Sequence, residues 1–155
     1  MPLFVRPYTN SDTATLCQLF YETVHGVNRA DYSPAQLDGW APKIPNADVW
    51  HQRMTEHITL VAEDATEIVG FGELADDRHI HMLFCRHDYV GRGVGSALLV
   101  ALEAASPAGA QALFTTFASL TARPFFAAQG YRVSRRRWFK RGGAELSNYL
   151  MEKQI

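Results

Sequence analysis

A glycine-rich turn between a short apolar run and an amphipathic helix constrains the fold of this chain more than any other feature. The apolar run ends at Leu83–Cys85, a polar turn follows, and glycines occupy positions 91, 93 and 95. Glycine has no Cβ, so such a turn can fold tightly and bring its N–H groups close to a ligand. Apolar residues then recur at three- and four-residue intervals, which predicts a helix. They are Val94, Ala97, Leu98, Ala101, Leu102 and Ala105.

This turn is suited to binding an anion. The first N–H groups of a helix have no intrahelical partner and lie at the positive end of the helix dipole. Residues 91–96 therefore predict a phosphate or pyrophosphate site, to which Arg92 adds a positive charge. Two nucleotide-binding patterns are disfavoured. The sequence has no GxxxxGK run followed by Ser or Thr, and its glycines are out of register for GxGxxG.

Two segments resemble the GNAT superfamily of acetyltransferases. Motif A of that family, (Gln/Arg)xxGx(Gly/Ala), corresponds to residues 90–95, with Val90 in the place of Gln or Arg. Residues 119–131 are similar to the family's second cofactor segment, NxxAxxFYxxxGF. Here Ser119 replaces Asn, and Phe126 replaces the Tyr that is often assigned as the general acid. The positions in register are Ala122, Phe125, Gly130 and Tyr131.

The order of elements predicts a mixed α/β architecture over one domain, residues 1–155. A helix between two strands predicts a βαβ crossover with parallel partners inside an otherwise antiparallel sheet. The resemblance implies a GNAT fold: a central, mixed, largely antiparallel sheet of six to seven strands, splayed between its fourth and fifth strands and flanked by about four helices. The strands expected are Leu3–Arg6, Ile58–Ala62, Ile68–Leu74, His79–Cys85, Ala112–Ala118, Arg132–Lys140 and Glu145–Met151.

Composition narrows the class of partner. The formal net charge is −1 and hydrophobic residues make up 47%, which argues against general attraction to nucleic acid or membrane. Cys17 and Cys85 are too few for a disulfide scaffold or a zinc site. We therefore expect a cytoplasmic monomer or homodimer with a small-molecule partner and no metal. The basic cluster at positions 132–141 favours a solvated strand face, with nucleic-acid binding as the alternative.

The resemblance also implies where a cofactor binds. In the family pattern, backbone groups of Leu83, Phe84 and Cys85 line the pantetheine of acetyl-CoA. The turn cradles the pyrophosphate through Gly91, Arg92, Gly93, Val94, Gly95 and Ser96. Ser119 and Phe126 belong to the second cofactor segment.

Candidate catalytic residues lie on the predicted strands. His79 and His81 alternate along one strand, so they share a face, and histidine can accept a proton near neutral pH. Position 79 lies where some family members carry a catalytic Glu. A solvent-facing or structural role is the alternative for each histidine. Glu73, on the preceding strand, is a further candidate for contact with the substrate.

The general acid and the acceptor pocket are predicted from the remaining aromatic residues. Phe126 cannot donate a proton, so Tyr149 is the candidate for protonating the leaving thiolate, with a purely structural role equally open. Tyr131 is expected in the core. Tyr32 and Trp40 lie where the family forms its acceptor pocket, and their aromatic rings either stack on the substrate or pack the loops.

The resemblance thus implies an acetyl-CoA-dependent N-acetyltransferase that acts on a primary amine. Two alternatives remain open. One is a sensor that binds acyl-CoA without turnover, because Val90, Ser119 and Phe126 all depart from the family pattern. The other is an acetyltransferase whose amine is carried on RNA or protein, which the arginine cluster would favour.

Overall fold

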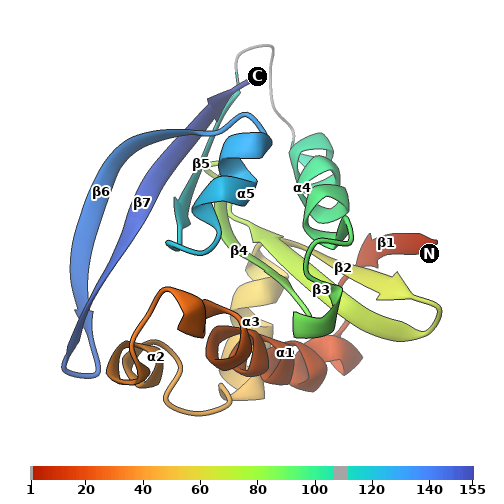
Figure 1. The fold of residues 1–155 in the computed structure, drawn as a ribbon. Coiled ribbons are helices and arrows are strands. Elements are labelled where there is room, and N and C mark those ends of the chain that lie inside the picture. Colours follow the sequence, from red (N-terminus) through yellow and green to blue (C-terminus); the bar gives the residue numbers. More distant parts are fainter. Residues whose placement is uncertain (1, 107–111) are drawn as a thin grey trace.

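Seven strands form a single mixed sheet in the computed structural model, which describes residues 2–106 and 112–155 (Figure 1). Their order across the sheet is β1-β2-β3-β4-β5-β7-β6. Only the β4–β5 pair is parallel among these strands. The strands are β1 (Leu3–Pro7), β2 (Ile58–Asp64), β3 (Glu67–Leu74), β4 (His79–Cys85), β5 (Leu113–Ala118), β6 (Arg132–Arg141) and β7 (Ala144–Gln154). The mixed, largely antiparallel sheet predicted from the sequence is therefore confirmed.

Five α-helices and three short 3-10 turns lie in the same described part of the chain, one helix more than expected. The helices are α1 (Thr13–Gly26), α2 (Pro34–Trp40), α3 (Ala47–Glu56), α4 (Val94–Ala105) and α5 (Arg123–Ala128), and the 3-10 turns are η1 (Asn10–Asp12), η2 (Asn28–Ala30) and η3 (His87–Tyr89). No helix in the described residues is long and apolar enough to cross a membrane. The predicted chain break at Pro107 and Gly109 lies outside the described residues.

The parallel strands β4 and β5 separate soon after they meet. Their register contains two pairs, His79 with Thr115 and Ile80 with Thr116, although β4 continues to Cys85. The Thr116 hydroxyl donates to the Ile80 carbonyl oxygen at 3.0 Å, at the last of these pairs. Beyond this point the two strands diverge, as predicted for strands four and five.

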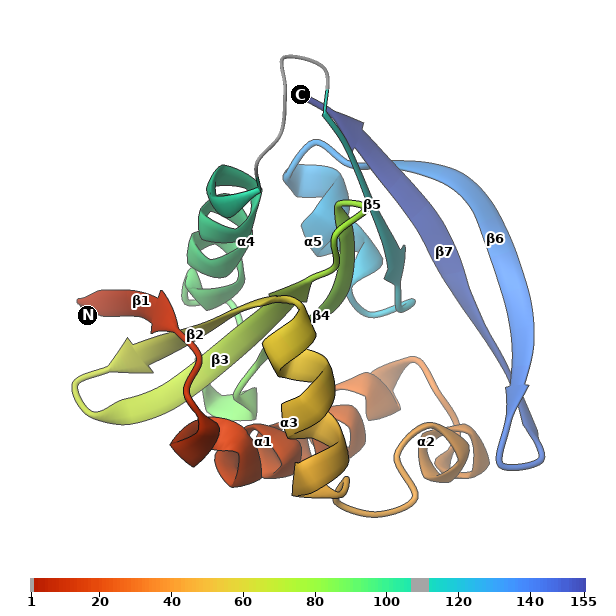
Figure 2. The same cartoon turned by 180° about the vertical axis from the view of Figure 1, so that it is seen from behind.

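The helices divide between the two faces of the sheet. Helix α4 packs on one face of β1 to β4, while α1 and α3 pack on the other face of β2, β3 and β4 (Figure 2). Glycines on β3 allow the close approach of α4. A Cβ at Gly70 would lie 2.6 Å from Val94 Cγ1, and a Cβ at Gly72 would lie 2.6 Å from Leu102 Cδ1. Neither position therefore tolerates a larger residue without moving α4.

Side-chain caps set the starts of α2 and α3. Ser33 caps α2: its Oγ accepts from the Gln36 N–H, and the Gln36 side chain accepts from the Ser33 N–H. Asn46 caps α3 by accepting from the Val49 N–H at 3.1 Å. This cap starts α3 at Ala47.

Candidate active site

The glycine turn adopts a backbone that only glycine takes readily. Gly91 has a φ of 77° and Gly93 a φ of 87°, and Gly93 is the residue that precedes α4. A Cβ built at either position would meet nothing within 4 Å. Glycine is thus needed there because of the positive φ, not because a side chain would clash with a neighbour. The space over the turn is therefore open. The N–H groups of Val94, Gly95 and Ser96, in the first turn of α4, have no intrahelical acceptor.

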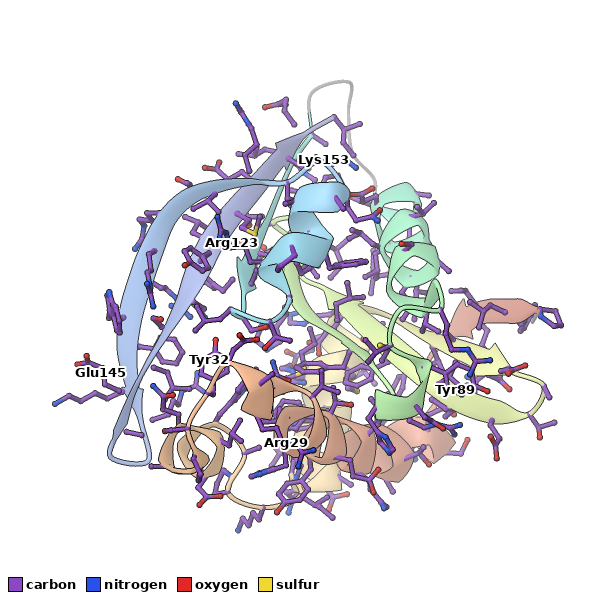
Figure 3. The ribbon with its side chains drawn as sticks, viewed as in Figure 1. Arg29, Tyr32, Tyr89, Arg123, Glu145 and Lys153 are labelled. Atoms are coloured by element: carbon purple, nitrogen blue, oxygen red, sulfur yellow. The ribbon has the colours of Figure 1, made fainter. Side chains whose placement is uncertain are left out.

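Two arginines are held beside this turn by one tyrosine ring. The Arg92 guanidinium carbon lies 4.2 Å from the Tyr89 ring centroid, and that of Arg86 lies 4.8 Å from it. The ring is anchored because the Tyr89 hydroxyl donates to Asp64 Oδ2 at 2.6 Å (Figure 3 labels Tyr89). Arg86 is also ion-paired with Asp88 and Glu67, and Arg92 adds charge at the positive end of the α4 dipole.

The second glycine segment meets the first through α5. A Cβ at Gly95 would lie 3.1 Å from Phe125 Cε1, so α5 packs directly on the first turn of α4. Gln129 Nε2 donates to Ser96 Oγ at 3.0 Å. Ser119 lies at the turn before α5, where its Oγ accepts from the Ala122 N–H at 3.0 Å. The two segments that resemble the GNAT cofactor motifs are thus neighbours in space.

Phe126, which was predicted to contact the cofactor, is buried. Only 3% of it is exposed, and its ring packs edge-on against Tyr131 with centroids 5.3 Å apart. Tyr131 lies in the core as expected, and its hydroxyl donates to Glu103 Oε2 at 2.7 Å.

The pairing of β4 with β3 contains a bulge. Glu73 pairs with Met82 and Leu74 with Ile80, so His81 has no opposite residue on β3. Such an extra residue bends a strand and re-aims its side chains. Of the predicted pantetheine residues, Phe84 stacks on Phe71 with ring centroids 5.9 Å apart.

One backbone carbonyl at the end of β4 is already hydrogen-bonded within the protein. The Cys85 carbonyl oxygen accepts from Thr23 Oγ1 at 2.9 Å, which ties this strand end to α1. Leu83 lies on the opposite face, where its Cδ1 would be 3.1 Å from a Cβ at Gly72. Burial raises the pKa of the Cys85 thiol, so this cysteine is a neutral thiol near neutral pH.

Glu73 is the centre of a buried ionic cluster at the foot of α3. Its side chain has no exposed surface. Arg53 donates to it from Nε and Nη2 at 3.0–3.2 Å, and the His57 Nδ1 lies 2.5 Å from Glu73 Oε2. Burial raises the pKa of Glu73, but the hydrogen bonds from Arg53 and His57 outweigh it and lower the pKa overall. The His81 ring lies 6.2 Å from that of His57, between centroids.

His79 lies on the same face as His81 but has different neighbours. Its Nδ1 is 2.8 Å from Thr115 Oγ1, and its ring meets that of Phe117 edge-on at 4.9 Å between centroids. Burial lowers the pKa of His79, and the charge of Arg137 lowers it further. Burial also lowers the pKa of His81, although the charge of Glu73 opposes this. Both imidazoles are therefore mostly neutral at pH 7.

Tyr149 lies on the other face of the sheet, away from the two histidines. It packs in the cluster that contains Phe125 of α5, and the Arg123 guanidinium carbon lies 5.0 Å from its ring centroid. Figure 3 shows Arg123 on α5 beside β7. The structure therefore separates the predicted acid from the predicted bases by the thickness of the sheet.

The aromatic residues predicted for the acceptor pocket pack against the protein. Tyr32 is 6% exposed, and its hydroxyl donates to the Ser147 carbonyl and accepts from the Leu120 N–H, both at 2.9 Å. Trp40 is half-buried and meets Tyr32 edge-on at 5.5 Å between centroids. Tyr32 thus joins the α2 region to β7 and to the turn before α5 (Figure 3).

Residues 28–153 match the family described as "Acetyltransferase (GNAT) domain". The chain belongs to the GNAT family of acetyltransferases. This match spans both glycine segments and the splayed strands, so the resemblance drawn from the two motifs is confirmed.

Known GNAT proteins resemble the chain over nearly its whole length. An uncharacterized N-acetyltransferase of Escherichia coli, YafP, is 31% identical over 147 residues, which are 95% of this chain and 93% of that protein. A crystal structure of a GCN5-related N-acetyltransferase from Rhodopseudomonas palustris is 34% identical, with a TM-score of 0.93, over 100% of this chain and 97% of that one. The PaiA N-acetyltransferase of Thermoplasma acidophilum, solved in complex with coenzyme A, shares the fold at 18% identity, with a TM-score of 0.74 and full coverage of both chains.

Three residues near the site of this GNAT domain were missed by the sequence reasoning. Arg53 and His57 were missed because no local motif marks them, and their partner Glu73 is distant in sequence. Arg137 was predicted only as one member of a solvated cluster, although it is half-buried against Phe117. The available signal was a pair of basic residues, Arg53 and His57, at the end of a helix, together with a glutamate at an otherwise apolar position of a strand.

Proposed function

We propose that this GNAT domain transfers the acetyl group of acetyl-CoA to the primary amine of a small-molecule or peptide acceptor. The observation that carries the proposal is the glycine turn at the start of α4, with Gly91 and Gly93 at positive φ, next to the opening between β4 and β5. A turn of this kind offers backbone N–H groups to a diphosphate.

The residues at the turn fit coenzyme A. No Cβ fills the space over Gly91 and Gly93, and Arg92 of the same turn contributes a guanidinium that contacts the Tyr89 ring. Two proteins with the same fold have been solved with a ligand bound. The Thermoplasma acidophilum protein holds coenzyme A, and the Salmonella typhimurium protein holds acetyl-CoA. This supports a pyrophosphate held by residues 91–96 and a pantetheine arm along Leu83–Cys85.

Acetyl-CoA supplies an activated acyl group, and the transfer needs one proton acceptor and one proton donor. The amine nitrogen forms a bond to the thioester carbon, and the carbon–sulfur bond breaks with its electron pair on sulfur. The proton lost by the amine goes to a base, and the thiolate takes a proton from an acid or from water. Positioning the two reactants supplies much of the acceleration, roughly 7 to 11 kcal/mol at best.

The neutral imidazoles of His79 and His81 are the proposed bases. When His79 Nδ1 donates to Thr115 Oγ1, its Nε2 carries the lone pair that accepts a proton. His57 is oriented by Glu73 in the same sense, with Nδ1 toward the carboxylate. We assign Glu73 a positioning role toward His57 and His81, because its own oxygens are occupied by Arg53 and His57.

Tyr149 is the proposed acid. It lies on the face covered by α5, opposite the histidines, so an acceptor that enters from the α3 face and a thiolate that leaves on the α5 face would each meet their own proton-transfer residue. Arg123 and Arg136, with guanidinium carbons 5.0 Å and 5.6 Å from the Tyr149 ring centroid, would stabilise developing negative charge near the phenol.

Release of free thiol from acetyl-CoA tests the proposal. The purified chain is incubated with acetyl-CoA and a panel of primary amines, and the thiol is followed with a chromogenic disulfide while the product is identified by mass. Amine-dependent thiol release with an acetylated product is expected. Coenzyme A binding in calorimetry without thiol release from any amine would instead indicate a sensor that lacks turnover.

A further inference from the structure

Arg137 of β6 is held firmly on the face of the sheet that carries His79. Its guanidinium carbon lies 3.6 Å from the Phe117 ring centroid and 4.9 Å from that of Phe139. Its Nε donates to Oδ1 of the buried Asn148 at 2.7 Å. Two rings and one neutral amide therefore fix the guanidinium plane, and Nε is the nitrogen that the amide uses.

The charge of Arg137 has no counter-charge within the described part of the protein. Arg6, Arg53 and Arg86 each form an ion pair with a carboxylate, whereas Arg137 forms none with any described residue. Burial and the charges of Arg141 and Arg135 lower its pKa, which reflects a cation kept among other cations. Holding a half-buried arginine in this way costs stability unless an anion completes its environment.

Phe117 connects this cation to the proposed base. Its ring contacts the Arg137 guanidinium on one side and the His79 imidazole, 4.9 Å away between centroids, on another. Phe117 is also 38% exposed, so the ring that separates the two groups is accessible to a ligand. In Figure 2, α5 lies behind β5 and β7, on the face of the sheet that points away from the viewer.

We propose that Arg137 selects acceptors that carry a carboxylate, which pairs with its terminal nitrogens while the amine of the same molecule lies at His79. This inference rests on the proposed acetyl transfer. A guanidinium matches a carboxylate with two parallel hydrogen bonds, which makes arginine the usual partner for that group. Because Arg137 and His79 contact the same ring, the amine and the carboxylate of the acceptor are joined by a short spacer, as in a small amino acid.

The arginines of β6 lie on both sides of the strand. Arg136 points to the opposite side of β6, where its Nε and Nη2 donate to Ser147 Oγ at 3.2 Å and 2.8 Å. Successive arginines of this strand therefore serve different faces. Arg141 lies on the Arg137 side, because both guanidiniums contact the Phe139 ring. A tRNA arm in the test therefore distinguishes a polyanion from a small carboxylate.

Paired acceptors test the inference. The rate constant kcat/KM is measured by thiol release for β-alanine, 4-aminobutyrate and L-phenylalanine, each against its neutral carboxamide. At least one carboxylate is expected to exceed its carboxamide by about tenfold or more, and Arg137→Gln is expected to abolish that ratio. Arg137→Lys keeps the positive charge but cannot make the two parallel hydrogen bonds of a guanidinium, so it should retain part of the ratio. Arg132→Gln, at an exposed arginine of the same strand, is the matched control and should leave the ratio unchanged.

Other outcomes overturn the inference without touching acetyl transfer. Thiol release with equal rates for acids and carboxamides, or a ratio that survives Arg137→Gln, would refute it. So would salt-sensitive inhibition by tRNA that Arg132→Gln and Arg137→Gln weaken equally.

Should no amine release thiol at all, acetyl transfer itself fails. The carboxylate site is then decided by NMR: β-alanine, but not β-alaninamide, must shift the Arg137 Nε–H resonance, and absence of that shift refutes the site. Thermal unfolding of each variant, compared with the parent protein, shows that lost selectivity is not lost folding.

Discussion

Arg53 grips the Glu73 carboxylate through both Nε and Nη2, at 3.0–3.2 Å, although Glu73 has no exposed side-chain surface. The pair joins α3 to β3 directly beneath the bulge that displaces His81. A buried carboxylate stays ionised only when hydrogen bonds from cationic side chains replace its hydration shell.

Replacing Glu73 by glutamine should destabilise the protein. Glu73→Gln keeps the volume but leaves Arg53 without its counter-charge, which costs about 2–4 kcal/mol for a pair that is buried on one side. The free energy of unfolding in urea measures this. Glu67→Gln is the control, since that carboxylate is 67% exposed and its ion pair with Arg86 lies at the surface, so little change is expected. Equal effects of the two changes would contradict the prediction.

The same carboxylate predicts how stability depends on pH. The pKa of Glu73 in the folded protein lies below its ordinary value of 4.5, because the bonds from Arg53 and His57 outweigh burial. Its contribution to stability is therefore complete above about pH 4.5 and is lost as pH falls through the folded pKa. Unfolding free energies of the parent and Glu73→Gln proteins should converge on acidification from pH 7 to pH 3. A gap that stays constant over this range would rule the explanation out.

A glutamate at position 93 should prevent coenzyme A binding. Gly93→Glu places a side chain and a negative charge in the open space over the turn, besides straining a residue with a φ of 87°. Gly143→Glu is a matched control, because Gly143 in the β6–β7 turn has a φ of 80° and equally open surroundings. Calorimetry should show no measurable binding for the first variant and unchanged affinity for the second. Binding retained in Gly93→Glu would remove the basis of the proposed function.

The histidines predict the acidic limb of the pH–rate profile. Since burial lowers the pKa of both His79 and His81 below 6.5, kcat/KM should fall with acid at a midpoint under pH 6.5. His79→Gln or His81→Gln should lower kcat by roughly 100-fold for whichever residue is the base. His87→Gln, at an exposed histidine near the glycine turn, is the control. A limb that persists unchanged in both variants would exclude these two bases.

Removing the Tyr149 hydroxyl tests the proposed acid. Tyr149→Phe should lower kcat by about tenfold, and less for a leaving thiol of low pKa, because such a thiolate needs no proton from the enzyme. Coenzyme A affinity should stay the same, since the ring and its contact with Arg123 remain. Tyr21→Phe, on α1, serves as the control for loss of a phenol. Unchanged kcat for all acyl donors would mean that water protonates the thiolate.

Much of the fold could be predicted because its signals are local. The glycines at 91 and 93 and the helix period after Val94 each act within a few residues of chain. The parallel β4–β5 pair followed from the helix between them, as crossover geometry requires. That residues 1–155 form a single domain remains a prediction, as do the cytoplasmic location and the oligomeric state.

The site was only partly predictable, because side-chain direction depends on distant packing. The bulge at His81 is invisible in the alternation of His79, Ile80 and His81, yet it decides which neighbours each histidine meets. Likewise the arginine cluster of β6 resembled a solvated face, and its split between two sides appeared only from the pairing with β7.

The sequence by itself determined the anion-binding turn, the family and the order of strands, since each depends on backbone conformation encoded within short segments. Tertiary structure decided which side chains meet: Arg53 and His57 on Glu73, and Arg137 beside His79 across Phe117. These contacts join residues many positions apart, and they depend on strand register and burial, which only the packed sheet establishes.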